Sequence, residues 1–258
     1  PLIPARLTNV LEAPLDNGGL AITLEDRNGQ ETLCLHRNGT VTPVIAAVRV
    51  PATLEGKARH NIQNAMAALG LALGMGIALP EITDALASFR SDHKDNPGRL
   101  NFYSDLPFRI VHDSAHNPHG MRLLCDALKH ITVSGRRICV LSGVGTRHGE
   151  HIEEMVKIVA DQFDFFICSR RERVTQLSEI TRDFPLEEVP QRVADALLAE
   201  GVDPKSILVI DLDTKAVDRG LEMAREGDLL ALLTGLVSWT GERVMDFARK
   251  HGVRAKAP

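Results

Sequence analysis

The stretch of this 258-residue chain with the most reactive groups is VHDSAHNP, residues 111–118. A carboxylate, two imidazoles and an amide lie close together there, and such groups suit contacts with hydroxyls, phosphates or a metal ion. A metal would need His112 and His116 on one helical face, which Pro118 disfavours by excluding helix from the residue before it. In a plainer interpretation, one polar residue of the stretch only caps the following helix: Asp113, Ser114 or Asn117.

A second candidate is GKARHNIQNA, residues 56–65. Asn61 and Asn64 are three residues apart, so they share one face of a helical turn. Each amide offers a hydrogen-bond donor and an acceptor. Two such amides at the start of a helix could bind a purine edge, whereas the alternative is ordinary helix capping by Asn61.

Two loops carry weaker patterns. Arg99 follows a Pro-Gly turn and could reach a phosphate across a cleft, or it is simply solvated. The loop GVGTRHG, residues 143–149, nearly matches the dinucleotide-binding glycine pattern but has one residue too many. Because Arg170 and Arg171 end the next strand, where they would suit a 2′-phosphate, an NADP-binding protein is a third class to consider. The alternatives are an anion-tolerant loop and a solvated basic turn.

The first part of the chain is predicted to form β-hairpins followed by two helices. Asn-Gly pairs at 17–18, 28–29 and 38–39 border the three candidate strands, which are Gly19–Thr23, Thr32–His36 and Val41–Ala47. Residues rich in Ala, Leu and Met predict a helix over 61–73. Pro80 suits the start of a second helix that runs to about Phe89, and the polar residues 91–97 are the best linker candidate.

After Pro97 the pattern alternates between strands and helices. The predicted strands are Phe108–His112, Ile138–Ser142, Phe163–Ser169, Ile207–Asp211 and Leu229–Thr234. The predicted helices are His119–His130, Glu150–Gln162, Leu186–Glu200, Lys215–Glu226 and Thr240–Lys250. This alternation predicts an α/β, Rossmann-like, doubly wound domain, with residues 99–104 as an antiparallel edge strand of a mostly parallel six-stranded sheet. Ligands of such sheets bind at the carboxyl ends of the strands.

Composition narrows the class of protein. The net charge is −4, and neither part of the chain has the basic excess that a nucleic-acid partner requires. No apolar run is long enough to cross a membrane, and the first residues do not resemble a signal peptide. The four cysteines are widely spaced, which favours free thiols in a reducing cytoplasm.

Three motifs in a fixed order show a resemblance to a known family. They are the helix start within PATLEGKARHNIQNAMAALGLALGMG, then NPGRLNFY, then VHDSAHNPHGM. In this combination the chain resembles the Mur ligase family of ATP-dependent ligases, and within it the ligase portion of cyanophycin synthetases, over about residues 19–258. The resemblance implies that residues 1–96 are the last part of a central ATP-binding domain. Residues 97–258 would be the C-terminal domain that brings the amino-acid substrate.

The resemblance also implies roles for individual residues. His60, Asn61 and Asn64 would lie at the adenine of ATP. Arg99 would contact its phosphates and Asp113 its ribose hydroxyls. The residues lining the cleft near the incoming amino acid would be His116, Asn117 and, in the loop 143–149, Arg147. Of all these, the candidates for a catalytic role are Arg99, Asp113 and His116.

The sequence departs from the family pattern in what it lacks. It contains no phosphate-binding loop of the form G-x-x-x-x-G-K-[ST], and the magnesium ligands of the family would precede its first residue. We therefore expect a fragment, a subunit with a partner, or a degenerate relative that is inactive alone. A folylpolyglutamate-synthase-like ligase and a non-catalytic nucleotide-binding module remain alternatives. Formation of a homo-oligomer is left open.

Overall fold

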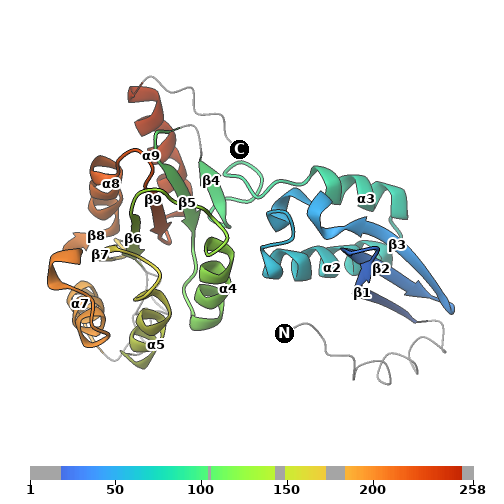
Figure 1. Cartoon of the computed structure of the whole chain (residues 1–258), viewed down its shortest axis with the longest axis horizontal. Helices are drawn as coiled ribbons and strands as arrows, with labels where there is room; N and C mark the ends of the chain where they lie inside the picture. Colours follow the sequence, from blue (N-terminus) through green and yellow to red (C-terminus); the bar gives the residue numbers. More distant parts are fainter. Residues whose placement is uncertain (1–18, 104–105, 143–148, 173–183, 252–258) are drawn as a thin grey trace. The chain divides into compact units, whose positions relative to one another are not determined.

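The computed structural model describes residues 19–103, 106–142, 149–172 and 184–251. The chain divides into two compact units, Pro1–Arg90 and Ser91–Pro258, and Figure 1 shows the elements of each. Residues 91–97, the predicted linker, belong to the second unit. Within them the Asp92 carboxylate accepts hydrogen bonds from the N–H groups of Lys94 and Asp95. This segment therefore forms an ordered turn.

The first unit is a three-stranded antiparallel sheet packed on two helices. Its elements are β1 (Leu20–Arg27), β2 (Gln30–Arg37), β3 (Thr40–Ala46), the short 3-10 helices η2 (Ala47–Arg49) and η3 (Pro51–Thr53), α2 (Arg59–Gly74) and α3 (Leu79–Ser88). Both described Asn-Gly pairs form the predicted tight turns, and their four residues have positive φ angles between 51° and 78°. Pro43 is tolerated because β3 is an edge strand.

One face of this sheet closes the core of the first unit. Leu33 and Ile45 from the strands pack with Ile62 and Leu69 of α2 and Ile82 of α3. The two helices therefore cover one face only, as the alternation of apolar and polar residues along β1 and β2 requires.

The second unit is a doubly wound domain. Its strands are β4 (Asn101–Tyr103), β5 (Arg109–Asp113), β6 (Arg137–Ser142), β7 (Phe165–Arg170), β8 (Ile207–Leu212) and β9 (Leu229–Leu233). Its helices are α4 (Pro118–Leu128), α5 (Gly149–Val159), η4 (Leu186–Glu188), α7 (Val189–Ala199), η5 (Pro204–Ser206), α8 (Asp213–Met223) and α9 (Val237–Lys250). The six strands lie in the order β4-β5-β9-β6-β7-β8, and only β4 pairs antiparallel. The predicted mostly parallel six-stranded sheet and its antiparallel edge strand are confirmed.

Helices cover both faces of this sheet (Figure 1). Residues of α8 and α9 share a core with Ile110, Ile138 and Leu230 of the strands, while α4, α5 and α7 pack against one another on the opposite face. All five residues of β9 are buried, as expected for a central strand covered on both sides. In the strand order, β9, the last strand of the described residues, is inserted between β5 and β6.

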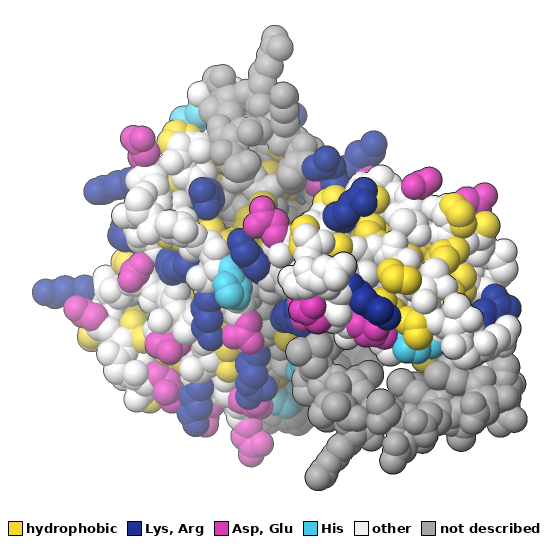
Figure 2. Space-filling view, turned by 45° about the vertical axis from the view of Figure 1, so that its right-hand side comes forward, with side chains coloured by type: hydrophobic (Ala, Val, Ile, Leu, Met, Phe, Trp, Pro, Cys, Tyr) yellow, Lys and Arg dark blue, Asp and Glu magenta, His cyan; other side chains and the backbone are white. Residues whose placement is uncertain are grey.

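The surface charges and the cysteines of the structure are as the amino-acid composition predicts. On the face seen in Figure 2, basic and acidic side chains are interspersed. All four cysteines are buried and unpaired. Among the described residues, no helix is both long and apolar enough to cross a membrane.

Candidate functional site

The site in the second unit forms where β5 ends. Asp113 is the last residue of the strand, and its carboxylate accepts hydrogen bonds from the N–H groups of Leu100, at 2.8 Å, and Ala115, at 2.7 Å. Arg99 donates through Nη1 to the Ser114 hydroxyl at 2.7 Å. The backbone also joins the two segments, since Ser114 N donates to Gly98 O at 2.9 Å. The motifs NPGRLNFY (residues 96–103) and VHDSAHNP (residues 111–118), which lie on neighbouring antiparallel strands, thus form one constellation.

Asp113 has capacity left after these bonds. Each carboxylate oxygen accepts one of the two hydrogen bonds, and each can accept a second. Burial raises the pKa of the Asp113 carboxyl, against the lowering effect of the hydrogen bonds from Leu100 and Ala115. A ligand that donates two hydrogen bonds would favour the charged carboxylate.

The turn that follows positions two more predicted residues. Asn117 is the N-cap of α4, because its Oδ1 accepts a hydrogen bond from Gly120 N at 2.8 Å. His116 is exposed, and its Nδ1 lies 2.9 Å from the carbonyl oxygen of Ser114. A carbonyl only accepts, so Nδ1 donates and the neutral ring keeps its lone pair on Nε2. The capping interpretation therefore holds for Asn117, while His116 keeps an accessible acceptor.

The predicted amide pair lies in the first unit, on α2. Asn64 Nδ2 donates to Asn61 Oδ1 at 3.1 Å, so the two amides do share a face. The capping interpretation of Asn61 is wrong: the helix begins at Arg59 with Ala58 as its N-cap, and Asn61 Nδ2 instead donates to Ala52 O at 2.6 Å. Asn61 is thereby anchored to η3, and the exposed Asn64 keeps a free Oδ1.

His60 lies beside this pair. Its Nδ1 is buried and has no hydrogen-bond partner, and burial lowers the pKa of the imidazole. Arg147 and the loop 143–148 lie outside the described residues, so the structure does not test their predicted part in the site.

Sequence reasoning missed the residue that organises the β5 site. Asn101 is fully buried, its Oδ1 accepts from Gly98 N at 2.6 Å, and its Nδ2 donates to three carbonyl oxygens. These bonds hold the turn that carries Arg99. The motif NPGRLNFY contains Asn101, but only the three-dimensional structure shows that its amide points into the turn formed by the preceding residues.

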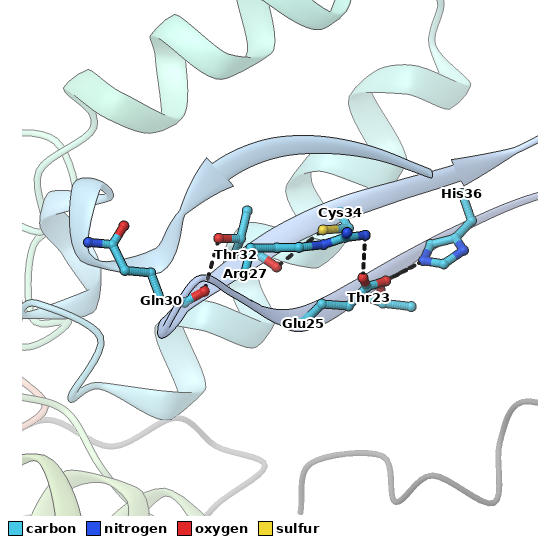
Figure 3. Close-up of polar contacts among 7 residues, drawn as sticks. All are labelled: Thr23, Glu25, Arg27, Gln30, Thr32, Cys34 and His36. Atoms are coloured by element: carbon cyan, nitrogen blue, oxygen red, sulfur yellow. Dashed lines mark hydrogen bonds and ion pairs between the residues drawn. The ribbon is translucent and has the colours of Figure 1, made fainter. Parts of the chain in front are cut away.

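A polar network on the first unit was also missed. Glu25 accepts hydrogen bonds or ion pairs from Thr23, Arg27 and His36, all on the face of β1 and β2 that turns away from the helices (Figure 3). The Thr23 hydroxyl lowers the pKa of Glu25, and His36 and Arg27 add to this against the effect of burial. The period-2 spacing of Thr23, Glu25 and Arg27 is the signal that could have revealed it.

Fold and site together define a doubly wound α/β domain with its polar groups at the carboxyl ends of the strands, preceded by a small sheet-and-helix unit. Residues 98–235 match the family described as "Mur ligase, glutamate ligase domain". The chain belongs to the Mur ligase family.

Named relatives agree with this assignment. The chain is 28% identical over 229 residues to cyanophycin synthetase of Trichormus variabilis, covering 87% of this chain and 23% of the relative. It is 30% identical over 200 residues to UDP-N-acetylmuramoyl-L-alanyl-D-glutamate–2,6-diaminopimelate ligase of Gloeobacter violaceus, covering 75% of this chain and 36% of the relative. The chain thus spans about a quarter to a third of the length of these relatives.

Solved structures share the fold. E. coli FolC in complex with DHPP and ADP gives a TM-score of 0.55 at 19% identity, over 90% of this chain and 46% of that one. Mycobacterium tuberculosis folylpolyglutamate synthase complexed with ADP gives 0.56 at 18% identity, over 96% and 53%.

Proposed function

We propose that this chain is part of an ATP-dependent, ADP-forming acid–amino-acid ligase of the cyanophycin synthetase or Mur ligase type. It would supply the adenine and ribose contacts and the domain on which the amino acid docks. Family membership supports the ligase class, and the β5 constellation of Arg99, Asp113 and His116 is the observation that carries the proposal. The free thiols of the four buried cysteines fit a reducing compartment such as the cytoplasm.

The described residues fit a nucleotide in three places. On α2, Asn64 presents a free amide oxygen and Asn61 is held beside it, which suits the donors and acceptors of an adenine edge; His60 borders them. Asp113 has one remaining acceptor position on each oxygen, which suits the two hydroxyls of a ribose. Arg99 is exposed next to Asp113 and suits a phosphate.

ATP would supply the phosphoryl group that turns a carboxylate into a reactive acyl phosphate, with Mg²⁺ expected on ligands outside these residues. The chain's own groups would position reactants and balance charge. Arg99 would offset negative charge on the phosphates. His116 would accept a proton at Nε2 from the ammonium group of the incoming amino acid, because its Nδ1 proton is bonded to Ser114 O. Asn117 would hold the turn in place, and Arg147 would assist in binding the amino acid.

The experiment is an ADP titration of the full chain by calorimetry. Asp113→Asn and Asn64→Ala are each expected to weaken ADP binding at least tenfold, whereas Asp126→Asn, an exposed aspartate paired with Lys129, should leave it unchanged. Failure of the wild-type chain to bind ADP, or equal binding by all variants, would remove the nucleotide from this site.

A non-catalytic nucleotide-binding module is the second candidate, because the 258 residues contain no phosphate-binding loop. Both candidates predict ADP binding, so a second assay separates them. ADP release from ATP is measured with a panel of amino acids on the protein encoded by the complete gene. Amino-acid-dependent release supports the ligase, and ADP binding without release supports the module.

A further inference from the structure

The strand β8 is an open edge of the large sheet (Figure 1). It hydrogen-bonds to β7 only, so its other side presents backbone N–H and C=O groups that can pair with another strand. The opposite edge strand, β4, has only three residues, which limits pairing there. β8 has six residues and none of them is buried, whereas all five residues of the central strand β9 are.

The side chains of this edge are apolar. Residues 207–210 are Ile-Leu-Val-Ile, without a charge or a proline. Leu208 and Ile210 pack on the core that α8 and α9 share with the sheet. Because side chains alternate along a strand, Ile207 and Val209 lie on the other face, the one that α7 covers. Val209 is nevertheless 43% exposed, so α7 leaves part of the edge uncovered.

A second exposed apolar side chain lies on the same face. Leu198 of α7 is 42% exposed, and in the described part of the second unit Leu198 and Val209 are the only large hydrophobic side chains that are exposed. Arg192, Ala196 and Ala199 of α7 line a groove toward α5. Helical periodicity places Leu198 roughly a third of a turn away from these residues. Leu198 is therefore turned away from α5, toward the free edge at β8.

The edge is complementary to itself in an antiparallel pairing. When Leu208 lies opposite Leu208 of a second copy, Ile207 of each copy lies opposite Val209 of the other. Directly opposed β-branched side chains on one face stabilise a pair of strands. The symmetric arrangement therefore forms this apolar contact twice.

The charges at the ends of the strand favour the same register. Lys205 of one copy lies level with Asp211 of the other, and both residues are exposed. A pairing centred on Ile207 would instead bring Asp203 level with Asp211, and like charges opposed across strands are unfavourable. The register of β8 against β7 shifts beyond Val209, so the regular part of the new ladder would end before Asp211.

We propose that β8 pairs antiparallel with β8 of a second copy of this chain, across a two-fold axis near Leu208 that runs perpendicular to the sheet. The two large sheets then continue into one, and the α7 helices of both copies lie on the same face with Leu198 beside the seam. Both copies use the same surface, so the contact closes as a dimer and does not propagate into a fibre. Three strands separate β8 from β5, so the dimer does not rest on the proposed function.

The test is sedimentation velocity of the full chain without nucleotide, at low ionic strength and from about 1 µM to about 500 µM. A contact between two strand edges is expected to give a reversible dimer, of twice the 28.2 kDa of one chain, with a micromolar dissociation constant. Val209→Lys places a charge opposite Ile207 of the second copy and should raise this constant about tenfold or more. Val41→Lys is the matched control, because Val41 is 39% exposed on the edge strand β3 of the other sheet. It should change the constant less than about twofold.

An exchange of charges tests the partner and the register together. In a homodimer, Lys205→Glu opposes two acidic groups and Asp211→Lys opposes two lysines, so each variant alone should dimerise about tenfold more weakly. A mixture of the two variants restores opposite charges at both ends of the ladder, so it should form a heterodimer nearly as strong as the wild-type dimer. Asp211→Lys also removes an exposed ion pair with Arg170. Thermal unfolding of each variant, followed by Trp239 fluorescence, confirms that the second unit is folded.

Three outcomes would overturn the inference. They are a monomer at every concentration, a dimer that Val209→Lys does not weaken, and a mixture of the charge variants that associates no better than either variant alone. None of these measurements uses nucleotide, and the ADP titration does not depend on association. A dimer with the expected variant effects, in a chain that does not bind ADP, would therefore sustain this inference while the ligase assignment fails.

Discussion

Asp113 accepts a hydrogen bond of 2.8 Å from the backbone N–H of Leu100, a residue that has a positive φ of 53°. A branched residue seldom adopts this conformation, and here a carboxylate thirteen positions away stabilises it. The residue proposed to bind ribose thus also fixes the turn that carries Arg99. One side chain couples the geometry of the two motifs.

We expect Asp113→Ala to lower the free energy of unfolding of the second unit by about 2 kcal/mol, because two backbone N–H groups lose their acceptor. Asp113→Asn should cost about half as much, since its remaining oxygen still accepts one bond. Urea unfolding followed by fluorescence of Trp239, the only tryptophan, reports on this unit. Asp126→Ala is the control and should change stability by less than about 1 kcal/mol, because its ion pair is exposed. Unchanged stability of Asp113→Ala would refute the structural role.

Asn101→Ala should destabilise the same unit more strongly, by roughly 3 kcal/mol. The substitution leaves Gly98 N without its acceptor and the carbonyl oxygens of Ser91 and Asn96 without the Asn101 amide, while Arg99 O keeps the bond from the Ser91 hydroxyl. The same fluorescence measurement applies. Asn96→Ala removes only a long bond of 3.4 Å to Ser91 and should cost less than about 1 kcal/mol. Similar losses in both variants would contradict the central position of Asn101.

Gly241→Ala is expected to destabilise the second unit unless the His93 side chain is also truncated to alanine. A Cβ on Gly241 would lie 2.0 Å from the His93 ring, which packs on α9 at that point. We expect a loss of about 1–2 kcal/mol in the wild-type background and a much smaller one in His93→Ala. Gly120→Ala, where the nearest atom is 3.4 Å away, serves as the control. Equal costs in both backgrounds would show that the two residues do not interact.

His112 should make the second unit sensitive to mild acid. The ring is fully buried on β5, neither nitrogen has a partner, and burial with a smaller effect of His93 lowers its pKa to about 4. At pH values between about 6.5, the usual pKa of histidine, and about 4, the unfolded chain binds more protons at His112 than the folded chain does. The free energy of unfolding therefore falls as the pH falls through this range. The loss should reach roughly 3 kcal/mol at pH 4.

His112→Leu should remove this part of the pH dependence. At pH 7.5 the variant should be within about 1 kcal/mol of wild type or more stable, because it replaces a polar ring that has no hydrogen bonds. Urea unfolding at pH 7.5, 6, 5 and 4 provides the comparison. A variant with the same pH dependence as wild type would show that His112 is not the group responsible.

Local chemistry allowed part of the fold to be predicted from the sequence. Asn28-Gly29 and Asn38-Gly39 indicated their turns because few residue pairs tolerate two positive φ angles. The strand–helix alternation after Pro97 indicated the doubly wound domain, because the spacing of apolar residues that distinguishes a strand from a helix can be read within a few neighbouring residues. The start of α2 was placed two residues late, at Asn61, because its N-cap Ala58 carries no capping side chain.

The sequence by itself therefore determined the class of fold, the family and the motifs that meet at β5. Tertiary structure alone decided which polar groups face inward and which strands become neighbours. The insertion of β9 between β5 and β6 brings Gly235 to Arg171, and the return of residues 91–101 onto β5 surrounds Asn101 with carbonyl groups. The contact between Gly235 and Arg171 joins residues far apart along the chain, whereas the carbonyl groups around Asn101 come from its own turn, which folds back on β5. Only packing of the complete core selects both arrangements.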